Sequence, residues 1–596
     1  MFQLDYYFFL RNTGNHAEST KCHMMDLQLS EDLEDRKGVG RAYNNIANSY
    51  ISQGEYPKAV EFFSKAVKVW EKCQDEEAKR ITFNGLGIAF TEMKEVDQAV
   101  EMFCRALEIS CVMQDEAMQQ TVLKNLCWLF GKVWESGDGL SLLEHCVHYF
   151  TEKGKEEVAC LLSDNFSTAQ ISSCLDIRSK KTGGVVTSCS VKPASHYLQG
   201  SYCPGLADSV VLFFRYLECG PLKTPFLFLW ALSSQEDTLF AKVSLHSFLK
   251  KCGLHISQFK KEGKSLLASI VDDFLLAGKE EACSVTPTMM YELLVRPVES
   301  VFSEKITSVF FIPCEPLWHF PFVTLSDPSR KKALAREHCI HVSPSYRILN
   351  SLKEKEEKER KTYEMKAEEM PAPKLESALV IGSPPECKWI EFFLEEEEEY
   401  SEQVEQVFST EKDLPEIAIA EKEATHVENF LKETLQVGQV VSHINDKENC
   451  VASCLRNAGA FQLIHVATYV NESGCLLFSG SSRKDCILSP KMVSRLNLSQ
   501  TLLVVLSLRF VPSANPVQGH KLVGLVSAFL NAGVKHVLLS LPNSVEQTFA
   551  RHSVHFYKHL HEHSLDVHKA YKQSVLQMAR EEGQIRNLYS ALSLFG

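Results

Sequence analysis

Two short apolar segments of this 596-residue chain carry side chains that could do chemistry. The segment QLIHVATYV contains His465 and Tyr469, and the segment TLLVVLSL contains Ser507 and is followed by Arg509. If the two segments are neighbouring strands, a phenol and a guanidinium share one cleft and could bind a carboxylate or an acidic peptide. The alternative is nucleophilic catalysis, with His465 as the base and Ser507 or the nearby Cys475 as the nucleophile.

These side chains can act together only if strands bring them to one place in a sheet. From position 208 onward, short apolar runs alternate with helical patterns such as SLLASIVDDFLLAG. The runs are SVVLFFRYL, FLFLWAL, ITSVFFIP, CIHVSP, ESALVIGSP, QLIHVATYV, TLLVVLSL and VKHVLLSLP. Short, wholly apolar and β-rich runs of this kind are typical of parallel strands that are covered on both faces. The sequence therefore predicts an α/β domain with a mostly parallel sheet.

The N-terminal region repeats itself with a period of 40 residues. RAYNNIANSYISQGEYPKAVEFFSKAV aligns with RITFNGLGIAFTEMKEVDQAVEMFCRAL, so that Ala47 matches Gly87 and Phe63 matches Phe103. Small residues at the first pair of positions let two antiparallel helices approach closely, and the aromatic pair fills the space between hairpins. A helical solenoid is expected, with full copies at about 40–79 and 80–119 and partial copies on each side.

This pattern resembles the tetratricopeptide repeat family, whose members usually offer a concave groove to peptides or partner helices. The resemblance implies that the partners are proteins or peptides. The residues expected to face the groove are Arg41, Asn44, Asn48, Asn84, Lys124 and Trp128. A polar and slightly basic groove could receive an acidic or C-terminal peptide, and the alternative is a merely solvated helix face.

The C-terminal half resembles the CHAT domain, a caspase- and separase-like domain often joined to tetratricopeptide repeats. The segments that carry the resemblance are YELLVRPV, FFIPCEPLWHFPFVTL, HVSPSYRIL, LIHVATYV, LLVVLSLRF and HKLVGLVSAFLNAGVKHVLLSLP, in this order. The family pattern ends its histidine strand in H-x-A-x-H-G and its cysteine strand in L-S-x-C. Tyr469 and Arg509 stand at the positions of the catalytic His and Cys.

Neither replacement can do the work of the residue it replaces. A phenol that titrates near about 10 does not substitute for an imidazole that titrates near about 6.5. A permanently charged guanidinium is not a nucleophile. The resemblance therefore implies a degenerate pseudo-peptidase domain without enzymatic activity. The alternative is a cysteine-peptidase-like enzyme with an unconventional site, but His465 and Ser507 fall inside the predicted strands.

The expected organisation is multidomain, with an all-α solenoid followed by the α/β caspase-like domain. Residues 1–150 would form the repeats, 151–207 a linker rich in Ser and Thr, and 208–590 the CHAT domain. Charged insertions at about 351–375 and 386–415 would lie in surface loops. A solvated face is the expected state of these insertions, and an acidic docking site is the alternative.

Composition argues against several classes of function and location. The net charge of −13 argues against general binding of nucleic acid, which needs a basic surface. No run approaches the roughly 18 apolar residues of a membrane span, and the N-terminus lacks the features of a signal peptide. The 20 cysteines show neither paired spacings nor His partners, so reduced thiols are expected and no metal site is predicted.

No cofactor is expected, because no predicted strand is followed by G-x-G-x-x-G or by G-x-x-x-x-G-K-[ST]. The sequence favours a non-catalytic protein-binding adaptor or scaffold in the cytoplasm. One animal protein that joins a long tetratricopeptide array to a CHAT domain is similar in arrangement and is associated with the midzone and midbody of dividing cells. That similarity implies a cytoskeletal association as a finer expectation. The oligomeric state is left open.

Overall fold

The computed structural model describes two parts of the chain. The described residues are 16–134 except 114, short helical pieces between 146 and 167, and 206–595 with gaps at 220–223, 234–237, 262–263, 277–283, 331, 365–373, 383–414, 445–457, 472, 479–486, 511–518, 540–545 and 582–592. The chain divides into two compact units, residues 1–166 with 190–201 and residues 167–189 with 202–596. No helix among the described residues is long and apolar enough to cross a membrane.

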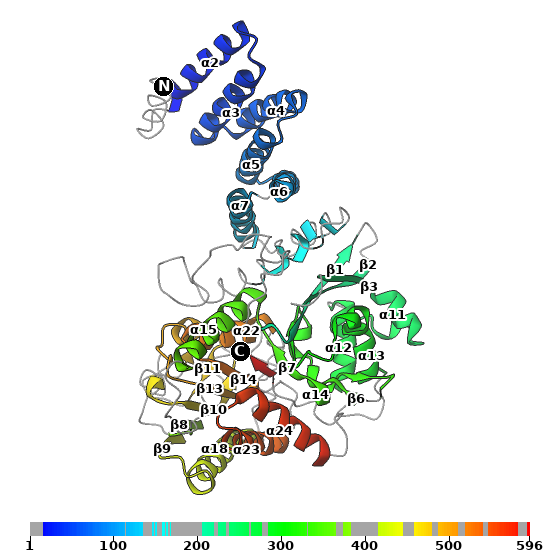
Figure 1. The fold of residues 1–596 in the computed structure, drawn as a ribbon, viewed down its shortest axis with the longest axis vertical. Helices are drawn as coiled ribbons and strands as arrows, with labels where there is room; N and C mark the ends of the chain where they lie inside the picture. The colour runs from blue at the N-terminus through cyan, green and yellow to red at the C-terminus, as the bar shows by residue number, and fades with distance from the viewer. Residues whose placement is uncertain are drawn as a thin grey trace, which may run out of the picture. The chain divides into compact units, whose positions relative to one another are not determined.

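The first unit contains a series of antiparallel helices (Figure 1). The helices are α2 (His16–Asp32), α3 (Arg36–Ser52), α4 (Tyr56–Cys73), α5 (Glu76–Glu92), α6 (Val96–Val112) and α7 (Glu116–Trp134). The pairs α3/α4 and α5/α6 are the two full copies that the sequence predicts, and α2 and α7 belong to the partial copies.

Small residues and aromatic rings alternate between these helices as the sequence predicts. A Cβ atom added at Gly85 on α5 would lie 2.5 Å from the ring of Phe63, and one added at Gly87 would lie 2.6 Å from the ring of Phe103. Both rings are buried, with Phe63 1% exposed and Phe103 not exposed. The two glycines therefore let the rings of α4 and α6 reach the backbone of α5.

An ion pair with a buried arginine joins α5 to the start of α7. Arg80, which is 6% exposed, is paired with Asp115. The other carboxylate oxygen of Asp115 accepts a hydrogen bond of 3.0 Å from the backbone amide of Met118, in the first turn of α7. Asp115 thus caps one helix while it neutralises a cation on the preceding repeat.

The second unit is built on one large sheet, which contains 13 strands among the described residues. The strands are β1 (Ser209–Cys219), β2 (Thr224–Ser233), β3 (Leu239–Ser244), β4 (Ser308–Ile312), β7 (Cys339–Val342), β8 (Ser377–Gly382), β9 (Gln439–Ile444), β10 (Leu463–Val470), β11 (Leu476–Leu477), β12 (Ile487–Leu488), β13 (Leu503–Phe510), β14 (His536–Leu539) and β15 (Ser593–Phe595). A separate ribbon pairs β5 (Ser326–Asp327) with β6 (Lys332–Ala333).

The sheet is mostly parallel, which confirms the predicted fold class. Parallel pairs join β1 to β4, β4 to β7, β8 to β9, β8 to β10, β10 to β13 and β13 to β14. The short strand β15 pairs with β14 on one side and with β7 on the other, and so connects the two halves of the sheet. It extends the sheet beyond residue 590, which the sequence analysis gave as the end of this domain.

Helices accompany this sheet, and the central strands are covered on both sides. The helices are α11 (Leu245–Lys251), α12 (Leu266–Leu276), α13 (Pro287–Leu294), α14 (Leu334–Glu337), α15 (Tyr346–Glu364), α18 (Pro415–Asn429), α21 (Pro490–Val493), α22 (Gly519–Asn531), α23 (Glu546–Glu562) and α24 (Val567–Glu581). Every residue of β8 and of β10 is buried, as the wholly apolar patterns predict.

Several predicted segments lie wholly or partly outside the described residues. The charged insertion at 386–415 falls almost entirely in an undescribed part of the chain. Most of the predicted linker at 151–207 does so too, as does much of the third repeat copy beyond α7. The insertion at 351–375 begins as helix: α15 starts at Tyr346 and ends at Glu364.

Candidate functional site

The two strands that carry the candidate site are parallel neighbours. In the register of β10 with β13, Tyr469 lies opposite Arg509, and Ala467 lies opposite Ser507. Because side chains alternate along a strand, His465 and Tyr469 project from the same face of the sheet as Ser507 and Arg509. The structure therefore confirms that the predicted phenol and guanidinium belong to adjacent strand ends.

A row of small residues crosses the sheet just below this pair. Gly382 at the end of β8 lies opposite Ala467 on β10, which lies opposite Ser507 on β13. A Cβ atom at Gly382 would come within 2.3 Å of the Cβ of Ala424 on α18. Glycine at this position therefore lets α18 lie close against the strands.

This close approach places one acidic side chain of α18 inside the site. Glu423 is 3% exposed, and its Oε2 accepts hydrogen bonds from Ser507 Oγ at 2.9 Å and from Arg509 Nη2 at 3.2 Å. Its Oε1 lies 3.4 Å from His465 Nε2. The sequence suggested that Tyr469 and Arg509 could bind a carboxylate, and the chain itself supplies one to Arg509.

The surroundings keep Glu423 ionised. Burial by itself raises the pKa of this carboxyl group, but the contacts with His465, Arg509 and Ser507 outweigh burial and lower the pKa below its ordinary value. The guanidinium of Arg509 is permanently charged, and its side chain is only 12% exposed. A buried anion and a nearly buried cation therefore neutralise each other at the place where two strands end.

The network extends to α23 through the other side of the imidazole. His465 Nδ1 lies 2.8 Å from the hydroxyl oxygen of Tyr557. Burial, followed by the charge of Glu423, raises the pKa of Tyr557 well above its usual value, so this hydroxyl stays protonated and can donate to the imidazole. The two ring nitrogens of His465 therefore contact residues from two helices, Glu423 on α18 and Tyr557 on α23.

The structure also places the side chains of the alternative catalytic arrangement, His465, Ser507 and Cys475. His465 is fully buried and Ser507 is 3% exposed, and both contact the carboxylate of Glu423. Burial raises the pKa of Cys475, which disfavours the reactive thiolate. As the sequence predicts, His465 and Ser507 lie inside strands rather than at an open strand end.

Two members of this network escaped the sequence analysis. Glu423 lies on a helix that follows the second charged insertion, where one more acidic residue attracts no notice. Tyr557 is separated from its partner His465 by 92 positions. The only local signal is the glycine that ends the run ESALVIG, since a glycine in a buried strand often marks a close approach of another backbone.

The expected groove of the first unit contains polar side chains that are already engaged. Asn44 Oδ1 accepts a hydrogen bond of 3.0 Å from Thr82 Oγ1, and Asn84 Oδ1 accepts one of 2.8 Å from Asn125 Nδ2. These contacts link α3 to α5 and α5 to α7. The two predicted asparagines therefore link successive repeats through their amide oxygens. Their amide NH₂ groups are the part of each side chain that could donate a hydrogen bond to a ligand.

The other predicted groove residues are exposed. Arg41 lies 3.3 Å from Asp35, while Asn48 and Lys124 face solvent and Trp128 is 38% exposed. Ile81, one repeat after Arg41, is 45% exposed and was missed, although the 40-residue period points to it. The helix surface is therefore less purely polar than the sequence analysis expected.

Comparisons with known proteins match this architecture. The CHAT domain family model matches residues 287–589, and a tetratricopeptide repeat model matches residues 38–111. No curated protein is significantly similar to this chain.

Among solved structures, BtubC (BKLC) from P. vanneervenii is 19% identical with a TM-score of 0.22, covering 28% of this chain and 70% of its own. The Saccharomyces cerevisiae separase-securin complex at 2.6 Å is 11% identical with a TM-score of 0.39, covering 99% of this chain. This chain spans 49% of that separase structure's matched chain.

Proposed function

Since a CHAT domain model matches just over half of this chain, the chain belongs to the CHAT domain family, and we propose that it is a protein-binding adaptor that does not cleave peptide bonds. The observation that carries the proposal is the pairing of Arg509 with the buried carboxylate of Glu423 at 3.2 Å. The position that the family pattern gives to a nucleophilic thiol therefore holds a neutralised cation.

Peptide-bond cleavage of this class needs a nucleophile and a base that can exchange a proton at an accessible point. Here the hydroxyl of Ser507 donates to Glu423, and the imidazole of His465 is held between Glu423 and Tyr557. All of these side chains are buried. This arrangement supports a role of the network in stabilising the domain, because none of these four side chains is exposed to act on a substrate as an acid or a base.

The repeats supply the binding role. Tetratricopeptide repeats generally mediate interactions between proteins, and this chain has such repeats at residues 38–111. We propose that the exposed side chains of Arg41, Lys124, Trp128 and Ile81, on α3, α5 and α7, form one surface that offers two cations and two partly exposed apolar side chains. Its preferred ligand is a peptide with both acidic and apolar residues, because carboxylates pair with the cations and apolar side chains cover the rings and branched chains.

The binding role is tested by charge reversal on the full chain. Affinity capture followed by mass spectrometry would compare the wild type with the double variant Arg41→Glu/Lys124→Glu. The matched control is Lys58→Glu/Lys65→Glu, which reverses two exposed lysines on α4. We expect the first variant to lose a set of partners that the control retains. Identical partners for all three proteins would contradict a groove built on α3 and α7.

The absence of catalysis is tested on the purified protein. The full chain would be incubated with a peptide library, and cleavage products would be compared between the wild type and the variants Ser507→Ala and Cys475→Ala. We expect no cleavage that depends on either residue. Cleavage abolished by one of these substitutions would establish the alternative, a peptidase-like enzyme with an unconventional site.

The proposed location is the cytoplasm, with association with the cytoskeleton as the finer expectation. The proposal rests on the adaptor role and on the similarity in domain arrangement described above. Fluorescence imaging of the tagged full chain through the cell cycle would test it. Even distribution at every stage would contradict the cytoskeletal part alone.

A further inference from the structure

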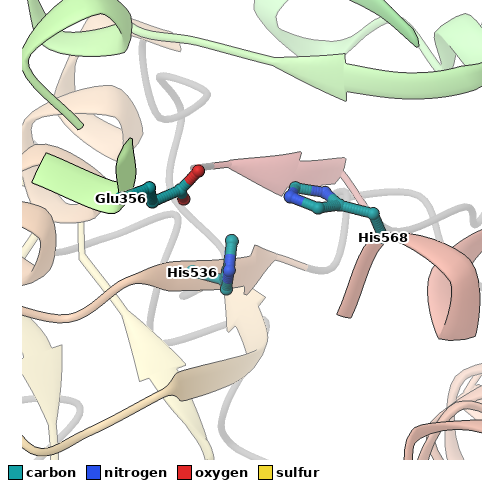
Figure 2. A group of neighbouring side chains, drawn as sticks. All are labelled: Glu356, His536 and His568. Atoms are coloured by element: carbon teal, nitrogen blue, oxygen red, sulfur yellow. The ribbon is translucent and has the colours of Figure 1, made fainter. Parts of the chain in front are cut away.

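A second group of ionisable side chains lies outside the Glu423 network. Glu356 on α15, His536 on β14 and His568 on α24 each place one potential ligand atom within 4.8 Å of those of the other two. Figure 2 shows the three side chains pointing toward a common space from three different elements. The sequence separation of these residues explains why no spacing motif revealed them.

His536 and the neighbouring His341 are buried, His568 is half-buried, and all three rings are incompletely hydrogen bonded. His536 is 6% exposed, and its ring centroid lies 4.9 Å from that of His568. His341 on β7 is 1% exposed, with its ring centroid 4.6 Å from that of His568. The Nδ1 atoms of all three rings are buried and have no hydrogen-bond partner among the described residues. Such atoms are unfavourable unless something else binds them.

The group is arranged to keep its imidazoles neutral. Burial, assisted by the positive charge of Lys353, lowers the pKa of both His536 and His568 to about 3. Lys353 also lies 3.0 Å from Glu356 Oε2 and is itself nearly buried. A neutral imidazole is the form that binds a metal ion, while the ammonium group occupies the place of a cation beside the carboxylate.

We propose that Glu356, His536 and His568 form a binding site for a divalent transition metal, with Zn²⁺ as the preferred ion. Two imidazole nitrogens and one carboxylate oxygen are common zinc ligands, whereas Ca²⁺ and Mg²⁺ prefer oxygen alone. The side chain of Glu356 is 35% exposed, which gives a hydrated ion a route to the buried His536.

The geometry requires only modest side-chain movement. Ligands at about 2.1 Å from a tetrahedral zinc ion lie about 3.4 Å apart, so the present separations of up to 4.8 Å must shorten. Rotation of the partly exposed Glu356 and His568 side chains can supply this change. The metal would take the place of the Lys353 ammonium beside Glu356, so Lys353 competes with it.

A metal at this position would be structural. The three ligands come from α15, which follows β7, from β14 in the other half of the sheet, and from α24, which packs against β7. The strand β15 joins the same two halves by pairing with both β7 and β14. The ion would therefore add a cross-link at the junction that β15 forms.

The test uses the purified full chain without an affinity tag that contains histidine. The protein would be depleted of metal with a chelator, and Zn²⁺ binding would be measured by competition with a chromophoric chelator. Co²⁺ would be added separately, because tetrahedral coordination by nitrogen and oxygen gives a visible absorption band. We expect the wild type to bind one ion that Glu356→Gln and His568→Ala each weaken at least tenfold.

Two further variants distinguish zinc binding at this site from zinc binding elsewhere on the protein. Lys353→Met removes the competing ammonium and should strengthen zinc binding. His555→Ala removes the histidine of another pair, His555 on α23 with Glu581 on α24 at 3.2 Å, and should leave binding unchanged. Absence of zinc binding by folded wild-type protein, or equal binding by the wild type, Glu356→Gln and His568→Ala, would overturn the proposal.

Discussion

Replacing Glu423 by Gln tests whether the buried carboxylate holds the charge of Arg509. Glutamine keeps the size and planar shape of the side chain and can still accept a hydrogen bond from Ser507. It removes the negative charge that lies 3.2 Å from the guanidinium. Arg509 is only 12% exposed, so water can replace this charge only in part.

The expected loss in the free energy of unfolding follows from the distance between the two charges. At the separation of 3.2 Å and an effective dielectric constant of about 20, the attraction between the two charges is about 5 kcal/mol. Removing one member of a buried ion pair typically destabilises a protein by about 3–5 kcal/mol. We expect Glu423→Gln to lower the free energy of unfolding by about 3 kcal/mol, since Arg509 retains some contact with water. That is a large share of the roughly 5–15 kcal/mol by which domains are stable.

Hydrogen exchange measured by mass spectrometry can report this loss of stability for each part of the chain separately. This matters because the chain has two units that need not unfold together. Peptides from β10 and β13 should exchange faster in Glu423→Gln, while peptides from α3 to α6 should not change. The variant Arg509→Met should also be destabilised, because it leaves the anion alone. The double variant Glu423→Gln/Arg509→Met should lose at least about 2 kcal/mol less than the sum of the single losses.

The effect should also depend on pH in a defined direction. The pKa of Glu423 is lower in the folded protein than its ordinary value, so its stabilising contribution is present above the unfolded pKa. That contribution disappears as the pH falls through the folded pKa, and the wild type and Glu423→Gln should converge in strongly acidic solution. A loss below about 1 kcal/mol at neutral pH, or strict additivity with Arg509→Met, would refute the reasoning.

Three further substitutions test the supports of the fold. Gly382→Ala should force α18 away from the sheet and lower the free energy of unfolding by about 1–3 kcal/mol in denaturant titrations, whereas Gly438→Ala, where a Cβ would meet only one atom at 3.5 Å, should have little effect. Tyr557→Phe should leave Nδ1 of His465 without its partner and cost about 1–2 kcal/mol, seen as faster exchange in β10. Asp115→Ala should remove a helix cap and one of the two carboxylates that pair with the buried Arg80, the other being Glu77, costing about 2 kcal/mol, with exchange in α7 as the readout.

Much of the fold could be predicted from the local sequence, because repeated helices and buried strands leave regular patterns of apolar residues. The 40-residue repeat predicted α3 to α6, and the small residue Gly87, which meets Phe103, follows from that alignment, whereas Gly85, which meets Phe63, does not. The apolar runs predicted β4, β7, β8, β10, β13 and β14. The strand β15 was missed, because three residues near the end of a chain carry too little pattern to indicate a strand in the middle of a sheet.

The sequence by itself predicted that Tyr469 and Arg509 lie on neighbouring strands, and the parallel register of β10 with β13 places them opposite each other. Only the tertiary structure decided what Arg509 contacts. The partner Glu423 lies 86 positions away, and it reaches the site because Gly382 admits α18 to the sheet. The same holds for Glu356, His536 and His568, because contacts between elements distant in sequence depend on packing, which no local spacing records.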